Sequence, residues 1–314
     1  MVTEPRKEFI IIKEFCKKNF KSKELWPSYY ERRYQEFLTF YEFFPKKQNI
    51  KILELGCGIG YYSAFLSKIA DEVIATDLET IDPTTHSPGL QITRDFLAAL
   101  NIKNVTVMNA SAEELPFDDN TFDLVFSSHV LEHIPNMNKA IEEIDRVLKP
   151  GGINFCIVPT TTDRIYAFFT FYIYLIKRTF AKIFNKLFPK KQTINPAVNT
   201  TKPIATTSIS YYLKYLPFPP PHGVLPSYLK EIKNWTLKNW RKNITNHNKI
   251  KLVTQYGLQL NPLLPFVSSI FPITAVNIFS FTRSLETKLG KNGFMKHFGI
   301  STLLITEKQV NKTK

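Results

Sequence analysis

The sequence predicts an α/β fold in which helices cover both faces of a doubly wound, mostly parallel sheet. The apolar run IKILELG (50–56) is typical of a buried strand, and it continues directly into Gly56, Gly58 and Gly60. Helical periodicity follows over 61–70, and a second apolar run then ends in the acid Asp77. Strand, glycine turn, helix and strand in this order are typical of a ligand-binding α/β unit.

The glycine turn and Asp77 together predict a ligand with an adenosine part. Glycines let the backbone approach a ligand closely, and the start of the following helix offers free N–H groups. Asp77 follows Gly60 by 17 positions and ends its strand at the same edge of the sheet, where it can accept hydrogen bonds from a ribose diol. A dinucleotide fingerprint, G-x-G-x-x-G, would place the third glycine one position later than Gly60.

The segments downstream complete an alternating pattern. Strands are predicted over 105–109 and 124–127, a helix over 139–149, and a turn and strand from LKPGG to Pro159. The spacing E-x-G-x-G-x-G and the words LPFDDNTFD, SHVLEHI and LKPGG, over about 50–160, resemble the small-molecule branch of class I S-adenosylmethionine-dependent methyltransferases, which includes ubiquinone and menaquinone methyltransferases. The resemblance implies a Rossmann-like seven-stranded sheet with its last strand antiparallel. It also implies S-adenosyl-L-methionine as cofactor and S-adenosyl-L-homocysteine as product.

The resemblance further implies which residues hold the cofactor. The glycines would lie under its methionine and ribose, Glu54 beneath the turn, Asp77 at the ribose hydroxyls and Leu78 on the adenine. Ser111 stands where the family usually has Asp, and a hydroxyl is a weaker acceptor for the adenine amino group than a carboxylate. The full expected set is Glu54, Gly56, Cys57, Gly58, Gly60, Asp77, Leu78, Ser111, Ala112 and Ser127, with Ser128 beside Ser127 under the sulfonium. We expect Cys57 to be a small residue packed inside the turn and not a nucleophile.

Two histidines are candidates for catalysis. His129 comes just after the fourth strand, where it would be either a base for a hydroxyl nucleophile or a wall of the pocket. His222 lies in the rigid loop PFPPPHGVLP (217–226), as a substrate contact, a base or a turn residue without a role. The Glu132–His133 pair looks like an acid–base dyad, whereas the resemblance implies that it mostly organises structure at the start of a helix. We see no metal-ligand spacing in the sequence and therefore expect no metal.

The chain outside the core divides into three further parts. We expect an N-terminal helical cap over 1–48, the cofactor-binding core over 49–159, an insertion over 160–225, and the rest of the sheet over 226–314. That last part should hold a helix over 227–245, strands over 250–256 and 300–306, and an apolar insertion over 257–298. Both insertions, apolar or basic in character, should leave the sheet at its carboxyl edge, where ligands bind.

Charge and apolar residues are distributed unevenly. Residues 1–159 carry 18 Lys and Arg against 23 Asp and Glu, a net −5, whereas residues 160–314 carry 23 against 4, a net +19. The uncharged run 165–176 leads into a basic amphipathic pattern up to 188, typical of a helix in a membrane interface. The apolar run 263–281 would be a lid or a membrane-dipping hairpin, or else buried helices. Three scattered cysteines and an N-terminus without a signal-peptide pattern indicate a reducing, cytoplasmic compartment. The apolar and basic insertions would place the protein peripherally on the inner face of a membrane.

These observations predict methyl transfer to a small-molecule or lipid-linked acceptor by in-line displacement, at an anionic membrane surface. The basic half also suits an RNA methyltransferase, because aromatic and basic residues alternate there as in surfaces that stack bases. A third hypothesis is a binding module that kept the fold and lost turnover.

Overall fold

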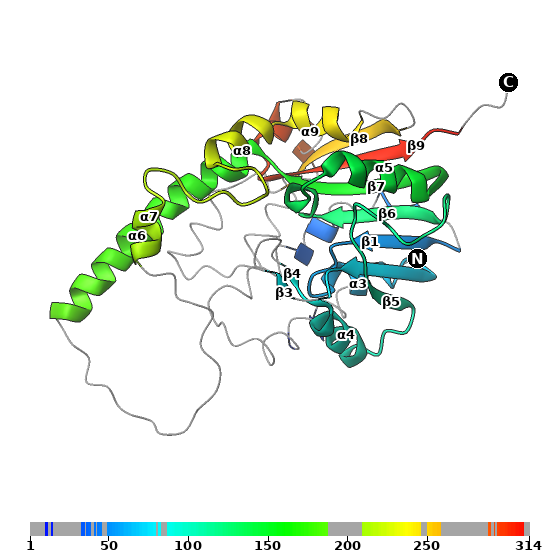
Figure 1. Cartoon of the computed structure of the whole chain (residues 1–314), viewed down its shortest axis with the longest axis horizontal. Helices are drawn as coiled ribbons and strands as arrows, with labels where there is room; N and C mark the ends of the chain where they lie inside the picture. Colours follow the sequence, from blue (N-terminus) through cyan, green and yellow to red (C-terminus); the bar gives the residue numbers. More distant parts are fainter. Residues whose placement is uncertain are drawn as a thin grey trace.

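The computed structural model describes residues 49–79, 81–82, 87–187, 209–245, 250–258 and 294–310, with a few positions before residue 49 and between 288 and 292. The apolar run 263–281 and most of the N-terminal cap lie outside the described residues. In the described part a seven-stranded sheet has the order β5-β2-β1-β6-β7-β9-β8 (Figure 1). Its strands are β1 Lys51–Leu55, β2 Glu72–Asp77, β5 Val105–Asn109, β6 Phe122–Ser128, β7 Leu148–Pro159, β8 Ile250–Leu258 and β9 Ser301–Lys308.

The pairing confirms the predicted Rossmann-like sheet. β1, β2, β5, β6 and β7 pair in parallel, and β9 runs antiparallel to both of its neighbours, β7 and β8. The chain leaves β1 toward β2 on one side and later returns to β6 on the other side. Such a reversal opens a crevice at the carboxyl ends of the central strands.

Helices cover both faces, as the doubly wound prediction requires. On one face, α3 (Tyr61–Leu66) and α4 (Leu90–Ala99) pack with aromatic residues from 34–44 against the sheet. On the other face lie α5 (Met137–Val147) and α9 (Leu237–Ile244). A short hairpin of β3 (Ile81–Asp82) and β4 (Ser87–Pro88) precedes α4.

The remaining helices differ from the prediction in their bounds. The single helix predicted over 227–245 is wrong: the structure has α8 (Tyr228–Asn234) and then α9, because the Thr236 hydroxyl accepts the N–H of Asn239 and starts a new helix. α3 ends at Leu66, short of the predicted residue 70, and α5 ends at Val147, so that Leu148 already belongs to β7.

The run after β7 forms one long helix, α6 (Thr161–Leu187), of 27 residues. It extends from the carboxyl edge of the sheet away from its body, with α7 (Ile209–Lys214) beside it (Figure 1). Within the described part of the chain, none of the helices has both the length and the apolar character needed to cross a bilayer. Short 3₁₀ turns, η1 (Leu131–His133) and η2 (Met295–Phe298), complete the described elements.

Lys308, at the end of β9, secures the C-terminal end of α5. Its ammonium group donates to the carbonyl oxygens of Asp145 at 2.6 Å and Leu148 at 2.7 Å. Carbonyls in the last turn of a helix have no partner within the helix, and a cation placed there also complements the helix dipole.

We therefore expect Lys308→Met to lower the free energy of unfolding by about 1–3 kcal/mol, the cost of leaving such carbonyls without a charged donor. Urea denaturation measures this change. The matched control is Lys251→Met on the neighbouring strand β8, where the lysine is exposed. Equal stabilities of the two variants would contradict the assigned role.

Candidate functional site

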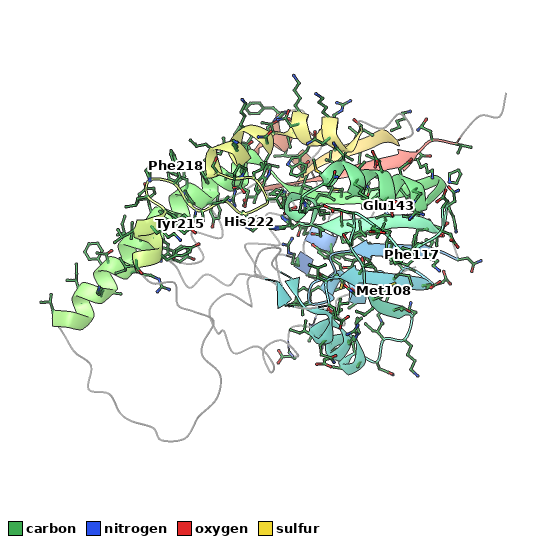
Figure 2. All side chains as sticks on the ribbon, viewed as in Figure 1. Met108, Phe117, Glu143, Tyr215, Phe218 and His222 are labelled. Carbon is green, nitrogen blue, oxygen red and sulfur yellow. The ribbon has the colours of Figure 1, made fainter. Side chains whose placement is uncertain are left out.

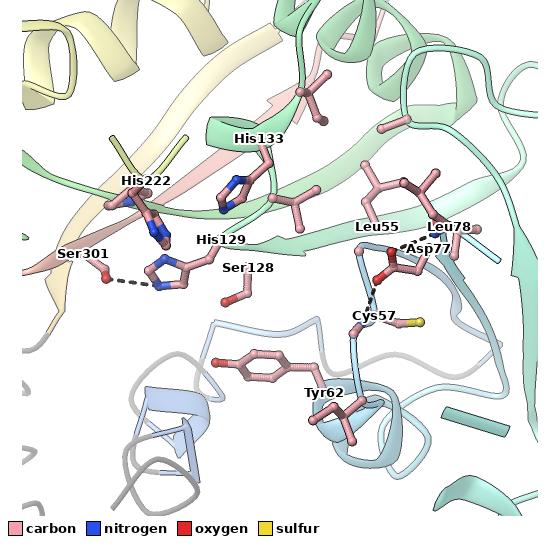
Figure 3. Close-up of a pocket in the computed structure, with 18 of the residues that line it drawn as sticks. Leu55, Cys57, Tyr62, Asp77, Leu78, Ser128, His129, His133, His222 and Ser301 are labelled. Carbon is pink, nitrogen blue, oxygen red and sulfur yellow. Dashed lines mark hydrogen bonds between the residues drawn. The ribbon is translucent and has the colours of Figure 1, made fainter. Parts of the chain in front are cut away.

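A cavity of about 620 Å³ lies at the carboxyl ends of β1, β2 and β6 (Figure 3). One side is formed by the glycine turn, the end of β2 and residues 110–113. The other side is formed by residues after β6, the start of α6, the loop with His222, and Ser301 at the start of β9. Of the expected cofactor residues, those that line the cavity are Gly56, Cys57, Gly58, Asp77, Leu78, Ser111 and Ala112.

The glycine turn is shaped by positive backbone angles. Gly56 has a φ of +65° and Gly58 a φ of +56°, a region that side chains disfavour. A Cβ on Gly56 would come within 2.3 Å of Val130, whereas a Cβ on Gly58 would have no atom within 4 Å. Gly56 is thus required for packing against the chain after β6, and Gly58 leaves open space where a ligand can approach the backbone. Gly60, outside the cavity lining, begins α3.

The carboxylate of Asp77 fixes this turn to the end of β2. One oxygen accepts the N–H of Gly58 at 2.8 Å, and the other accepts the N–H of Leu78 at 2.7 Å. A carboxylate has about four lone-pair positions. Two therefore stay available, and Asp77 can accept hydroxyl groups from a ligand in the cavity while it holds the turn. This arrangement fits the ribose role expected from the sequence.

Glu54 lies beneath the turn and does not line the cavity. Its side chain is buried and accepts the hydroxyl of Ser63 at 2.5 Å, so it links β1 to α3. Burial raises the pKa of Glu54 to about 8. The placement agrees with the expected steadying role, and the expected contact with the cofactor's amino group stays a prediction.

Three other residues that were expected to bind the cofactor, Cys57, Ser111 and Ser127, differ in how they lie relative to the cavity. Cys57 packs with Ala75 and Leu90. Burial is the main cause that raises the pKa of its thiol well above 9.0, and the nearby acids Glu54 and Asp77 add to it. A thiol with a raised pKa does not suit a nucleophile. Ser111 lines the cavity, and its hydroxyl accepts the N–H of Glu113 at 3.2 Å. Ser127 is fully buried outside the cavity, and its neighbour Ser128 takes the position at the cavity wall.

The two candidate histidines both reach the cavity, on the side away from the glycine turn (Figure 3). His129 has a φ of +57°, unusual for a residue with a side chain, and its N–H donates to the carbonyl of Ile157 at 2.8 Å. Its Nε2 lies 3.2 Å from the Ser301 hydroxyl, and its Nδ1 lies 3.4 Å from a carboxyl oxygen of Glu132. The ring therefore lines the cavity with one neighbour at each nitrogen.

His222 comes from a segment almost one hundred positions later in the sequence. Figure 2 places it at the carboxyl edge of the sheet, whereas Met108, Phe117 and Glu143 lie over the body of the sheet. Its ring centroid is 5.0 Å from that of His133.

Sequence reasoning missed several cavity residues, among them Arg33, Tyr62, Arg164 and Ser301. The Tyr62 hydroxyl donates to Glu36 at 2.9 Å, and Arg33 donates to the same carboxylate oxygen at 2.7 Å. Burial, followed by the Glu36 carboxylate, raises the pKa of Tyr62 well above its ordinary value. The position of Tyr62 directly after the glycine turn could have indicated that it lines the cavity. Arg33 and Ser301 belong to segments that carry no motif.

Comparisons with known proteins agree with the geometry. Residues 53–156 match the family model described as "Methyltransferase domain". A ubiquinone/menaquinone biosynthesis C-methyltransferase of Haemophilus ducreyi is 41% identical over 103 residues, 32% of this chain and 38% of that protein. A demethylmenaquinone methyltransferase of Staphylococcus aureus is 30% identical over 151 residues, 46% of this chain and 57% of that protein.

The chain thus spans between about a third and three fifths of the length of these relatives. Among solved structures, an S-adenosylmethionine dependent methyltransferase from Mesorhizobium loti aligns with a TM-score of 0.47 and 14% identity over 87% of this chain and 98% of that chain.

The raised pKa of Glu54 predicts a pH-dependent stability. A carboxyl with a pKa of about 8 when folded and an ordinary value of 4.5 when unfolded takes up a proton on folding between these values. The free energy of unfolding should therefore fall as the pH rises from about 5 to 8, by up to about 1.4 kcal/mol per pH unit for one such group.

Glu54→Gln keeps an acceptor for Ser63 but cannot ionise, so we expect its stability to fall less steeply over this range, by about 1 kcal/mol per pH unit. Denaturation in urea at several pH values measures the slopes. Glu142→Gln, at an exposed position of α5, is the control and should keep the wild-type slope. A Glu54→Gln slope equal to the wild type would show that Glu54 ionises at its ordinary pKa.

Proposed function

We propose that the chain transfers a methyl group from S-adenosylmethionine to a small-molecule acceptor, because residues 53–156 match a methyltransferase domain model and resemble two quinone methyltransferases. The observation that carries the proposal is the continuous cavity that extends from the glycine turn and Asp77 to His129 and Ser301. A cofactor bound on the first side would face an acceptor bound on the second side.

Each side of the cavity has a role in this reaction. The open space over Gly58 and the free lone pairs of Asp77 fit the ribose part of the cofactor, and Leu78, Ser111 and Ala112 line the space beyond it. The cofactor supplies a methyl group that its sulfonium charge has already activated. The chain must therefore align the acceptor and exclude water, and alignment provides much of the rate acceleration.

An oxygen acceptor also needs to lose its proton. His129 is the residue placed for this step, because its ring lines the cavity and contacts the Ser301 hydroxyl on one nitrogen and Glu132 on the other. A neutral imidazole can accept the proton, and the carboxyl group beside it would stabilise the resulting cation.

The finer part of the proposal is that the acceptor is lipid-like or lipid-linked and is presented by a membrane. The names of two relatives place them in quinone biosynthesis or at a menaquinone precursor, which supports an apolar acceptor. Asp163 and Arg164, in the first turn of α6, line the cavity, so a surface bound along this helix would lie next to the acceptor side.

The composition of α6 supports such a surface. Exposed apolar residues follow one another at helical spacing and form one stripe, which we call the α6 stripe: Ile165, Phe169, Ile176, Phe180, Ile183 and Leu187. Lys177 lies at the edge of this stripe, and Arg178 and Lys182 lie on the opposite face. An apolar stripe with a basic opposite face is typical of a helix that lies in a membrane interface.

The cofactor part of the proposal is tested by calorimetric titration with S-adenosylmethionine. We expect binding to the wild type, and a dissociation constant at least tenfold higher for Asp77→Ala, because the loss of charge-assisted hydrogen bonds costs more than about 1.4 kcal/mol. Glu79→Gln is the control, since Glu79 pairs with Arg94 on the surface. An unchanged affinity of Asp77→Ala would contradict the ribose role, and no binding to the wild type would favour the silent binding module.

The membrane part is tested by flotation with vesicles of phosphatidylglycerol and phosphatidylcholine. Phe180 is 68% exposed, and we expect Phe180→Ser to lower the partition coefficient about tenfold, because burial of such a side chain contributes about 1.5–3 kcal/mol. Val310→Ser, at a residue 62% exposed beyond β9, is the matched control. Equal flotation of the two variants, or none of the wild type, would argue against α6 as the contact.

A further inference from the structure

Glu132 is a buried carboxyl group whose oxygens lack hydrogen bonds within the described part of the chain. The residue is 3% exposed, and neither carboxyl oxygen accepts a hydrogen bond from the residues that the structure describes. Nδ1 of His129 lies 3.4 Å from one of these oxygens, and the ring is charged only when it is protonated. A buried polar group without hydrogen bonds is unfavourable, so a carboxyl left in this state points to a missing ligand.

Two further histidines lie at this carboxyl group. His133 is the next residue along η1, and His222 enters from the loop before α8. One potential ligand atom from each of Glu132, His133 and His222 lies within 4.8 Å of the other two. Imidazole nitrogens and a carboxylate oxygen are the donor set of many catalytic zinc and iron sites.

The backbone holds these three residues together independently of their side chains. The N–H groups of His222 and Gly223 both donate to one carboxylate oxygen of Glu231, each at 2.7 Å. The N–H of Val224 donates to the carbonyl oxygen of Glu132 at 2.9 Å. A Cβ at Gly223 would lie 2.3 Å from that same carbonyl oxygen, so only glycine lets the loop come this close to Glu132.

We propose that Glu132, His133 and His222 bind one divalent transition-metal ion, with Zn²⁺ as the representative case. Zinc binds nitrogen and oxygen ligands at about 2.0–2.2 Å, which places the ligand atoms of a tetrahedral site about 3.4 Å apart. The three ligand atoms therefore need to approach one another by about one ångström, a change that side-chain rotation can provide. The ion would be bound directly by the carboxylate oxygens of Glu132, which accept no hydrogen bond from the described residues.

The open position of this ion would face the acceptor. His133 and His222 line the cavity, and three protein ligands leave at least one coordination position for another group. An oxygen of the acceptor, such as a hydroxyl or an enol, is the chemical class that fits there, because a metal ion promotes its deprotonation. This assignment of the acceptor oxygen rests on the proposed function, whereas the metal site itself does not.

The experiment is a calorimetric titration of the chelator-treated full chain with Zn²⁺, without cofactor or acceptor. We expect one equivalent to bind to the wild type, and at least a hundredfold weaker binding for Glu132→Gln and for His222→Gln. The matched control is His297→Gln, because His297 is exposed and lies outside the cluster. It should bind Zn²⁺ as the wild type does.

Two further measurements complete the test. The first shows whether a variant lost a metal ligand or lost its fold, and the second shows whether the ion is bound by the histidines and Glu132 or by cysteine thiolates. Circular dichroism reports whether each variant is folded, and His222→Gln keeps the backbone hydrogen bonds that hold the loop. The visible spectrum with Co²⁺ distinguishes nitrogen and oxygen ligands from thiolates, since thiolate ligands add a strong charge-transfer band. A wild type that binds no Zn²⁺, variants that bind it as tightly as the wild type, or a thiolate band would each overturn the proposal.

Because the titration contains neither cofactor nor acceptor, its outcome is independent of methyl transfer. A chain that binds the cofactor but no Zn²⁺ would retain the proposed function without the metal site. A chain that binds Zn²⁺ but no cofactor would retain the metal site alone.

Discussion

The hydrogen bond from the Gly58 N–H to the carboxylate of Asp77 is the contact on which the cavity depends. It joins the turn after β1 to the end of β2, and these strands pair in parallel from Lys51 and Glu72 to Leu55 and Thr76. Since the carboxylate is satisfied by the backbone, Asp77 is held in position before any ligand arrives. A group that is positioned in advance loses little conformational freedom when it binds, and this favours affinity.

The side of the cavity that we propose for the acceptor is built differently, because its residues come from segments far apart in the sequence. His129 follows β6, Ser301 begins β9, and His222 belongs to the loop before α8. Buried contacts hold these segments together: the Thr160 hydroxyl donates to the carbonyl of Gly299 at 2.5 Å, and the indole of Trp240 donates to the carbonyl of Pro159 at 2.7 Å. The sheet therefore sets the cofactor side, and long-range packing sets the acceptor side.

This difference explains what the sequence could predict. The strands and the glycine turn were predictable, since periodicity and spacing are local, and the resemblance over about 50–160 implied the seven-stranded sheet with its last strand antiparallel. The division of the predicted helix 227–245 into α8 and α9 was not foreseen, because the apolar pattern continues through Thr236. Only the capping hydroxyl of Thr236 reveals the start of the new helix. No metal was expected from spacing, yet Glu132 and His222 lie 90 positions apart and meet only in the folded chain. The expected cofactor contacts and domain bounds stay predictions, and the apolar run 263–281 lies outside the described residues.

The base of the long helix α6 and the loop that carries His222 are held by the same carboxylate. Its 27 residues extend about 40 Å at the usual rise per residue, and its base is held where Arg164 pairs with Glu231 at 3.3 Å. Glu231 is the same carboxylate that accepts the N–H groups of His222 and Gly223. The base of α6 and the histidine loop therefore share one carboxylate, so a change in the tilt of α6 that displaced Glu231 would also weaken the hydrogen bonds that fix His222.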